Sequence, residues 1–391
     1  DQRFRYDGEG RPVPDRQERL DFTLVLPSAP PPLPNGYPVV IFQHGISGNR
    51  VNMLSLAPAL AARGYALIGI DAVAHGSRSF WASGDAVNNQ TGAPGPDGFK
   101  DRTPWSQTSS AEFFAYLLNA SAMRDNFRQT AVDLMQLARL VKNPNLDLTP
   151  FPDASLHTED GIYFVGDSLG TMFSVLFMAA EPSVRTAALN VAGGGLLTDL
   201  VSHSPDTVQW VLPFVPLLFG VPPETLLDPF DPVVNLMQTV IDPGDPINAA
   251  RHLIRDPLPV RGVPTPPVSV LQIMVEGDET VANTSNEALA RAIGLPLLVP
   301  YARPVEGLDS VSPPVRANRS SDAGYATAAL AQCSPACHGT NLHSAWGERS
   351  FVPGFPYPPG HDEPFPRLSE PVRIRQPFRE VQEQILHFFS S

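Results

Sequence analysis

Residues 161–170 read G-I-Y-F-V-G-D-S-L-G, an apolar run that ends in a serine enclosed by glycines. Residues 162–165 predict a buried strand, and the apolar residues 169–180 predict a helix directly after it. A sharp turn from strand to helix brings neighbouring backbone close, so the flanking positions must lack bulk, which glycine satisfies. The pattern G-x-S-x-G between strand and helix predicts that Ser168 is a nucleophile at a helix N-terminus.

The same alternation of strand and helix continues along most of the chain. Short apolar runs typical of strands alternate with segments in which apolar residues recur every three or four positions. We expect strands at 20–26, 39–42, 66–70, 186–192, 268–275 and 326–331, and helices at 51–63, 121–141, 285–293 and 378–389. This order predicts an α/β fold, with a mostly parallel sheet and helices on both faces.

The domain organisation follows from where this alternation breaks. Residues 1–36 are polar and rich in proline, and predict an arm that carries an edge strand. Residues 37–195 and 257–391 form the expected catalytic domain. Residues 196–256 include an apolar, proline-containing stretch and are interpreted as an inserted cap or lid over the carboxyl end of the sheet, with ordinary core helices as the alternative.

Composition and charge narrow the class of protein. The chain has 391 residues, of which 42% are hydrophobic, and a net charge of −13. This charge argues against nucleic acid and against an anionic membrane surface as partners, because both need clustered basic residues. No apolar run approaches the roughly 20 residues that span a bilayer. The chain begins at Asp1 rather than Met, and we expect a mature, monomeric protein that is secreted or periplasmic in a bacterium.

The two cysteines of the chain lie close together, in Cys333-Ser-Pro-Ala-Cys337. This spacing around a proline favours a small disulfide loop and an oxidising compartment. Because His338 and His343 follow, the same residues could instead form a zinc set, although structural zinc ligands usually come from two separate elements. Free thiols are the third alternative.

Three further stretches carry a resemblance to a known superfamily. Residues 42–48 read F-Q-H-G-I-S-G, residues 69–76 read G-I-D-A-V-A-H-G, and residues 276–281 read E-G-D-E-T-V. Together with G-D-S-L-G, they resemble the α/β-hydrolases, and within them the bacterial secreted lipases and esterases. Ala74 stands where that superfamily usually has glycine in its D-x-x-G-H-G loop. The resemblance covers roughly residues 37–300 and the last helix.

The resemblance implies specific roles for several residues. The backbone N–H groups of Ile46 and Leu169 would form the oxyanion hole. His44 and His75 would support their loops rather than act as the base. In this fold the order along the chain is serine, acid, histidine, so Asp278 is the expected acid, with Glu276 and Glu279 as alternatives.

The base is not decided by the sequence. The candidates after Asp278 are His338, His343, His361 and His387. His361 is favoured, because it follows a glycine in a loop ahead of the final helix. His338 is the alternative, since it follows the expected last strand. His343 and His387 rank below them, the latter because it lies inside the terminal helix.

These residues together predict a serine carboxylic-ester hydrolase, a lipase or esterase, that needs neither a cofactor nor a metal. Its substrate would be a small or polymeric ester. Phe80, Trp81 and Trp105 lie in a long loop near the expected site, and aromatic walls would fit polyesters such as poly(ethylene terephthalate). An amidase or thioesterase on the same fold, or a non-catalytic binding protein, are the alternatives.

Overall fold

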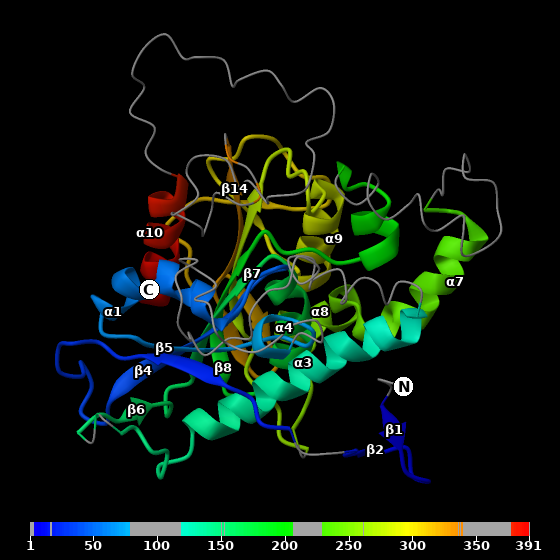
Figure 1. Cartoon of the computed structure of the whole chain (residues 1–391). Coiled ribbons are helices and arrows are strands. Elements are labelled where there is room, and N and C mark those ends of the chain that lie inside the picture. The colour runs from blue at the N-terminus through cyan, green and yellow to red at the C-terminus, as the bar shows by residue number, and fades with distance from the viewer. Residues whose placement is uncertain are drawn as a thin grey trace, which may run out of the picture.

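The computed structural model describes residues 4–15, 18–78, 119–149, 151, 153–205, 229–260, 262–334, 336, 338 and 377–390, the side chains of 377–380 excepted. Within these ranges, ten strands form one large sheet (Figure 1). In spatial order they are β11 (Ser310–Val311), β10 (Leu297–Leu298), β14 (Ala328–Cys333), β9 (Ser269–Val275), β8 (Val184–Asn190), β7 (Ile162–Asp167), β4 (Tyr37–Gln43), β5 (Ala66–Ile70) and β3 (Phe22–Val25), and β6 (Leu156–His157) pairs with β4 beside this path.

All neighbours in this sheet run parallel except at one edge, where β3 pairs antiparallel with β5. Strand β3 forms this edge of the sheet, with Phe22 opposite Ile70. Strand β4 is buried along its whole length, as its apolar residues 39–42 predict for a central parallel strand.

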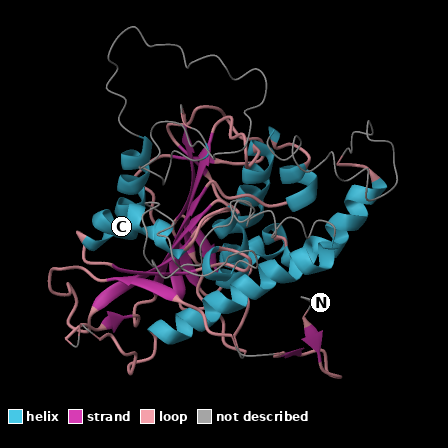
Figure 2. Cartoon of the chain, viewed as in Figure 1, coloured by secondary structure: helices cyan, strands magenta, loops and turns pink. Residues whose placement is uncertain are grey.

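Helices cover both faces of the sheet (Figure 2). One face packs against α3 (Ala120–Val141), α4 (Leu169–Ala180), α8 (Pro246–Ile254) and α9 (Asn283–Ile293), and the other against η1 (Arg50–Ser55), α1 (Ala57–Ala61) and α10 (Pro377–Ser390). The remaining described elements are β1 (Arg5–Tyr6) with β2 (Pro12–Val13), η2 (Gly76–Arg78), η5 (Leu196–Val201), α7 (Pro232–Ile241), η7 (Asp242–Gly244), and β12 (Arg319–Ser321) with β13 (Gly324–Ala326).

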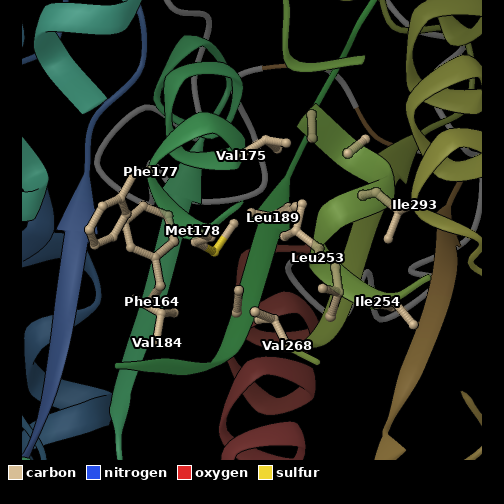
Figure 3. Close-up of a cluster of buried hydrophobic side chains, with 14 of the residues drawn as sticks. Phe164, Val175, Phe177, Met178, Val184, Leu189, Leu253, Ile254, Val268 and Ile293 are labelled. Atoms are coloured by element: carbon tan, nitrogen blue, oxygen red, sulfur yellow. The ribbon is translucent and has the colours of Figure 1, made fainter. Parts of the chain in front are cut away.

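The larger core lies between the sheet and the α3, α4, α8 and α9 layer (Figure 3). Phe164 of β7 and Phe177 of α4 are fully buried there, with ring centroids 5.9 Å apart. Leu253 of α8 and Ile293 of α9 belong to the same cluster. Burial of side chains of this size stabilises a fold by about 1.5–3 kcal/mol each, so the two aromatic rings anchor α4 on β7.

Most sequence-predicted elements are present, and their differences have local causes. Helix α4 and strand β5 have the predicted bounds. The helix expected at 51–63 is divided into the 3₁₀-helix η1 and the short α1, which restarts with Pro58 in its first turn. Residues 294–326 contribute the short strands β10 to β13. Strand β14 lies two residues further along the chain than the last strand expected at 326–331.

The expected cap, residues 196–256, includes a helix that belongs to the core. Ala250, Leu253 and Ile254 of α8 are buried in the larger cluster between α4 and α9, which agrees with the alternative of ordinary core helices for this part. Residues 206–228, with the apolar stretch 210–219, lie outside the described residues, so a cap formed by them stays a prediction.

The strand order defines where the chain reverses its direction across the sheet. From β4 the chain passes to β5 on one side, and from β5 it returns to β7 on the other side of β4. Ligands of parallel α/β sheets bind at such a point, outside the carboxyl ends of the strands. The loops that follow β4 and β7 meet at this point. With a helix starting directly at the end of β7, this is the α/β-hydrolase fold that the sequence predicts.

Among the helices of the described ranges, none has both the length and the apolar character that crossing a membrane requires.

Candidate active site

Ser168 occupies a strained turn between β7 and α4. Its backbone has φ 50° and ψ −122°, a conformation that residues other than glycine rarely adopt. The Ser168 N–H donates to the Asn190 carbonyl of the neighbouring strand β8, 2.9 Å away, which fixes the turn. Such a strained strand-to-helix turn is the nucleophile elbow expected from G-x-S-x-G, and it places the hydroxyl at the N-terminus of α4.

Glycine allows the turn to lie against the loop that follows β4. A Cβ on Gly170 would lie 2.4 Å from the Gln43 carbonyl oxygen and 2.5 Å from that of His44. From the other side, a Cβ on Gly45 would lie 3.0 Å from Ser168 Cβ. The register Gln43 opposite Gly166 thus brings the loop after β4 into direct contact with the elbow.

We predict that Gly170→Ala lowers the free energy of unfolding by about 3 kcal/mol, because both atoms in the way are backbone and the loop or α4 must shift. The midpoint of urea denaturation measures this loss. Gly8→Ala is the matched control, since a Cβ at Gly8 meets nothing within 4 Å. Its free energy of unfolding should stay within about 0.5 kcal/mol of the wild type. Equal midpoints for the two variants would contradict the close approach.

Asp278 lies in the loop after β9 and is 4% exposed. Its Oδ1 accepts hydrogen bonds from the N–H groups of Thr280 (2.9 Å) and Val281 (2.8 Å). Its Oδ2 lies 2.8 Å from Nδ1 of His338. The carboxylate is therefore held by the backbone on one side and faces an imidazole on the other.

The two alternative acids have other partners. Glu276 Oε2 accepts from Nε of Arg303 at 2.7 Å, in an ion pair that also includes Glu287. Glu279 is partly buried next to Asp278, and burial raises the pKa of its carboxyl group. Of the three carboxylates, only that of Asp278 has a hydrogen bond to the His338 imidazole among the described residues.

The structure brings His338 between Asp278 and Ser168. Its Nε2 lies 2.8 Å from Ser168 Oγ, while Nδ1 contacts the carboxylate. Because a carboxylate only accepts, Nδ1 carries the proton and Nε2 is free to accept from the serine hydroxyl. The favoured candidate His361 lies outside the described residues, as does His343, and His387 lies in α10. The described geometry thus supports the alternative base, His338.

The protonated form of His338 is stabilised despite its burial. Burial alone would lower its pKa, but the charge of Asp278 and the hydrogen bond to it raise it, as do the charges of Asp167 and Glu279. The net result is a pKa above the ordinary value of histidine. An imidazole in this environment can accept a proton from an adjacent hydroxyl and hold the resulting charge.

The two expected oxyanion donors lie next to the serine. Leu169 is the first residue of α4, so its N–H has no acceptor within the helix. Ile46 follows Gly45, whose position against Ser168 is described above, and its side chain packs on the same apolar cluster as Leu169. Leu169 thus adjoins Ser168 in the chain and Ile46 follows a glycine that lies against it, and the role of their N–H groups as oxyanion donors stays a prediction.

His44 joins two loops, as the resemblance implies. Its Nε2 accepts from the Ala72 N–H at 3.0 Å, and its Nδ1 donates to the Gly45 carbonyl at 2.8 Å. Burial lowers its pKa, so the ring stays neutral and both nitrogens are occupied. This side chain is thus a support for the loop after β4.

The loop after β5 is held by a buried ion pair. Asp71 Oδ2 accepts from Arg50 Nη1 at 2.6 Å and from the Ser77 N–H at 2.9 Å. His75, in the same loop, donates from Nδ1 to the Val73 carbonyl at 2.8 Å, and burial lowers its pKa to about 3. These contacts give Asp71 and His75 a structural role.

The sequence did not indicate the role of Asp167, which occupies the unspecified position before Ser168 in the G-x-S-x-G motif. It is buried at the end of β7, and its Oδ1 accepts from Asn190 Nδ2 of β8 at 2.7 Å. Its charge raises the pKa of His338. Asp167 stands in the quoted motif, but its partner follows only from the register of β7 and β8, which places Asp167 opposite Asn190.

An apolar cluster includes the first turn of α4, directly after the elbow. It contains Leu169, Met172, Leu200, Val234 and Val281, with Ile46, Val73 and Met237 packed at its border. These side chains come from α4, from the loops after β4, β5 and β9, and from η5 and α7. Apolar side chains therefore adjoin the start of α4, whereas His338 provides the side chain that reaches Ser168 Oγ.

The cysteine predictions fall partly outside the described residues. Cys333 ends β14, whereas Cys337 and His343 are not described, so both the disulfide and the zinc set stay predictions. Within the described ranges, no group of three or more histidine, cysteine, aspartate or glutamate residues could hold a metal ion.

Comparison with solved structures finds matches at low sequence identity. The chain is similar to acylaminoacyl peptidase of Pyrococcus horikoshii, with a TM-score of 0.43 and 10% identity over 87% of this chain and 37% of that chain. It is also similar to acetyl xylan esterase 1 of a Thermoanaerobacterium species, with a TM-score of 0.42 and 17% identity over 82% of this chain and 74% of the esterase. Est1E of Butyrivibrio proteoclasticus, solved with ferulic acid, gives a TM-score of 0.36 and 13% identity over 75% of this chain and 84% of Est1E.

The chain thus spans little more than a third of the length of the peptidase. No protein-family model and no curated protein sequence matches it. At these identities and scores the similar structures say nothing of its activity. The fold is identified by the strand order and by the turn at Ser168.

Proposed function

We propose that the protein is a serine carboxylic-ester hydrolase in which Ser168 is the nucleophile, His338 the base and Asp278 the acid. The observation that best supports this is the position of the His338 imidazole, 2.8 Å from Asp278 Oδ2 and 2.8 Å from Ser168 Oγ. A nucleophile in hydrogen-bond reach of a base, which is itself oriented by a carboxylate, is the arrangement that acyl transfer requires.

In the acylation step, Ser168 Oγ attacks the ester carbonyl carbon and its proton passes to Nε2 of His338. The N–H groups of Ile46 and Leu169 hold the negative oxygen of the tetrahedral intermediate, and each such donor contributes about 3–4 kcal/mol to lowering the barrier. The imidazolium then gives its proton to the leaving alcohol. Asp278 keeps the proton on Nδ1 and stabilises the imidazolium, and water releases the acid from Ser168 by the same steps in reverse.

The acyl group is expected to be hydrophobic. The apolar cluster around Leu169, Val281 and Ile46 adjoins the serine, and apolar surface favours an apolar ligand by about 25 cal/mol for each Å² removed from water. An esterase or lipase acting on hydrophobic esters, including polyesters, fits this environment. The aromatic residues Phe80, Trp81 and Trp105, which suggested an aromatic polyester, lie outside the described residues.

The test is hydrolysis of p-nitrophenyl esters from acetate to palmitate, beside the matching p-nitroanilides and thioesters. We expect ester hydrolysis with a preference for longer acyl chains, and covalent labelling of Ser168 by a fluorophosphonate, located by peptide mass spectrometry. Faster hydrolysis of the anilides or thioesters would assign the amidase or thioesterase alternative. Absence of both turnover and labelling would overturn the proposal in favour of a binding role.

A further inference from the structure

Asn190, the last residue of β8, holds two consecutive residues of the elbow. It is 1% exposed. Its carbonyl oxygen accepts from the Ser168 N–H at 2.9 Å, and its Nδ2 donates to Oδ1 of Asp167 at 2.7 Å. The parallel register, which places Asp167 opposite Asn190, brings these groups together. The main chain and the side chain of one residue thus fix both the serine and the residue before it.

The chain that follows Asn190 is fixed on its other side as well. Val191 has φ 46°, in the left-handed region that β-branched residues seldom adopt. Its N–H donates to the Ile273 carbonyl of β9 at 2.8 Å, and the Ala192 carbonyl accepts from Asn286 Nδ2 of α9 at 2.7 Å. Such a backbone conformation persists only where the surrounding structure determines it. Asn190 therefore lies in a firmly held segment between the elbow and β9.

The carboxylate of Asp167 lies between β8 and the loop after β4. Asp167 is 5% exposed, and a buried carboxylate costs free energy unless hydrogen bonds compensate its charge. While Oδ1 accepts from Asn190, Oδ2 lies on the side of Gly45, where a Cβ would be 3.4 Å from it. Gly45 directly precedes Ile46, the expected oxyanion donor. A displaced carboxylate would therefore disturb the turn at Ser168 and this loop together.

We propose that Asn190 is a positioning residue for the nucleophile. Its amide holds the Asp167 carboxylate and its carbonyl holds the Ser168 N–H, and together they keep Ser168 Oγ at 2.8 Å from Nε2 of His338. Asn190 acts through the elbow rather than on the substrate. This role rests on the function proposed above. Because misplacement of reacting groups by about 1 Å can cost 100-fold in rate, loss of the support should appear in kcat.

A reciprocal exchange of the two side chains provides the test. Asn190→Asp removes the donor to Asp167 and places two carboxylates in contact, so at pH 8 we expect kcat for p-nitrophenyl esters to fall about 30- to 100-fold, with KM within a few-fold. The double variant Asp167→Asn/Asn190→Asp restores one amide and one carboxylate with their positions exchanged. It should therefore recover kcat to within about five-fold of the wild type.

Asn190→Ala removes the amide without adding a charge and keeps the carbonyl. It should lower kcat by about ten-fold with little change in KM, because the backbone bond to Ser168 remains while the Asp167 carboxylate is released. Asn145→Asp is the control, since it adds one negative charge at an exposed position in the loop before β6, and its kcat and KM should equal those of the wild type. Steady-state kinetics on variants that circular dichroism shows to be folded measures both constants.

Wild-type kcat in Asn190→Ala would overturn the proposal, even if Asn190→Asp fails to fold. So would a double variant that folds but is as slow as Asn190→Asp, or a loss confined to KM. Failure of the proposed function looks different, because the wild type would then hydrolyse no ester and Ser168 would not be labelled by a fluorophosphonate. Urea denaturation would still show whether the pair exists, since its midpoint should fall in Asn190→Asp and recover in the double variant.

Discussion

Replacing His338 with alanine should lower kcat for p-nitrophenyl ester hydrolysis by roughly 10⁵- to 10⁶-fold, and Ser168→Ala should lower it equally. The reason is that His338 Nε2, 2.8 Å from Ser168 Oγ, is the only described group placed to take the serine proton. Nucleophile and base act as one unit, so the double variant should be no slower than either single one. Steady-state kinetics with active-site titration measures these rates.

The matched comparison is His361→Ala, which replaces the histidine that the sequence favoured. If His338 is the base, this variant should retain kcat within a few-fold, and circular dichroism melts should show all variants folded. A large loss in His361→Ala beside a small one in His338→Ala would assign the base to His361 and reject the triad proposed here.

Much of the fold could be predicted from local patterns. The apolar run of β5 lies between Gly64 and Asp71, and that of α4 begins directly after the elbow. Periodicity and turn residues are local signals, so both elements could be predicted from the sequence. Tertiary context changed the details elsewhere. The helix expected at 51–63 breaks into two at the turn before Pro58, and α8 joins the core although a cap was expected there.

Site residues that belong to a sequence motif could be predicted. Site residues that come together only through strand pairing could not. Ser168 and Asp278 each stand at the end of an apolar strand, so their positions could be read locally. His338 lies 60 residues from Asp278, and β14 and β9 bring them together by placing Cys333 opposite Val275. The pairing of parallel strands leaves no local signal in the sequence, because the connection between them is a dozen or more residues long.

Strand pairing across the sheet also explains why the sequence did not indicate the role of Asp167. The hydrogen bond between the side chains of Asp167 and Asn190 depends on the register of β7 and β8. No neighbour of Asn190 in the sequence would predict this contact. The missed residues therefore surround the triad rather than form it.

The second large effect is expected for Asp278→Asn, which should lower kcat by about 10⁴-fold. Oδ1 accepts from the N–H groups of Thr280 and Val281, so the amide oxygen of asparagine will keep that side and its NH₂ will face His338 Nδ1. The imidazole must then accept at Nδ1 and carry its proton on Nε2, the tautomer that cannot take the proton of Ser168.

The fold should remain intact in Asp278→Asn, since the shape of the side chain and its two backbone hydrogen bonds are retained, and fluorophosphonate labelling should slow in parallel with kcat. Glu276→Gln is the matched control, because it neutralises the carboxylate two residues earlier, which pairs with Arg303 at 2.7 Å instead of with the imidazole. We expect this control to keep kcat within a few-fold. A larger loss in Glu276→Gln than in Asp278→Asn would transfer the role of the acid to Glu276, and near-normal turnover in Asp278→Asn would mean that the tautomer of His338 is set by another group.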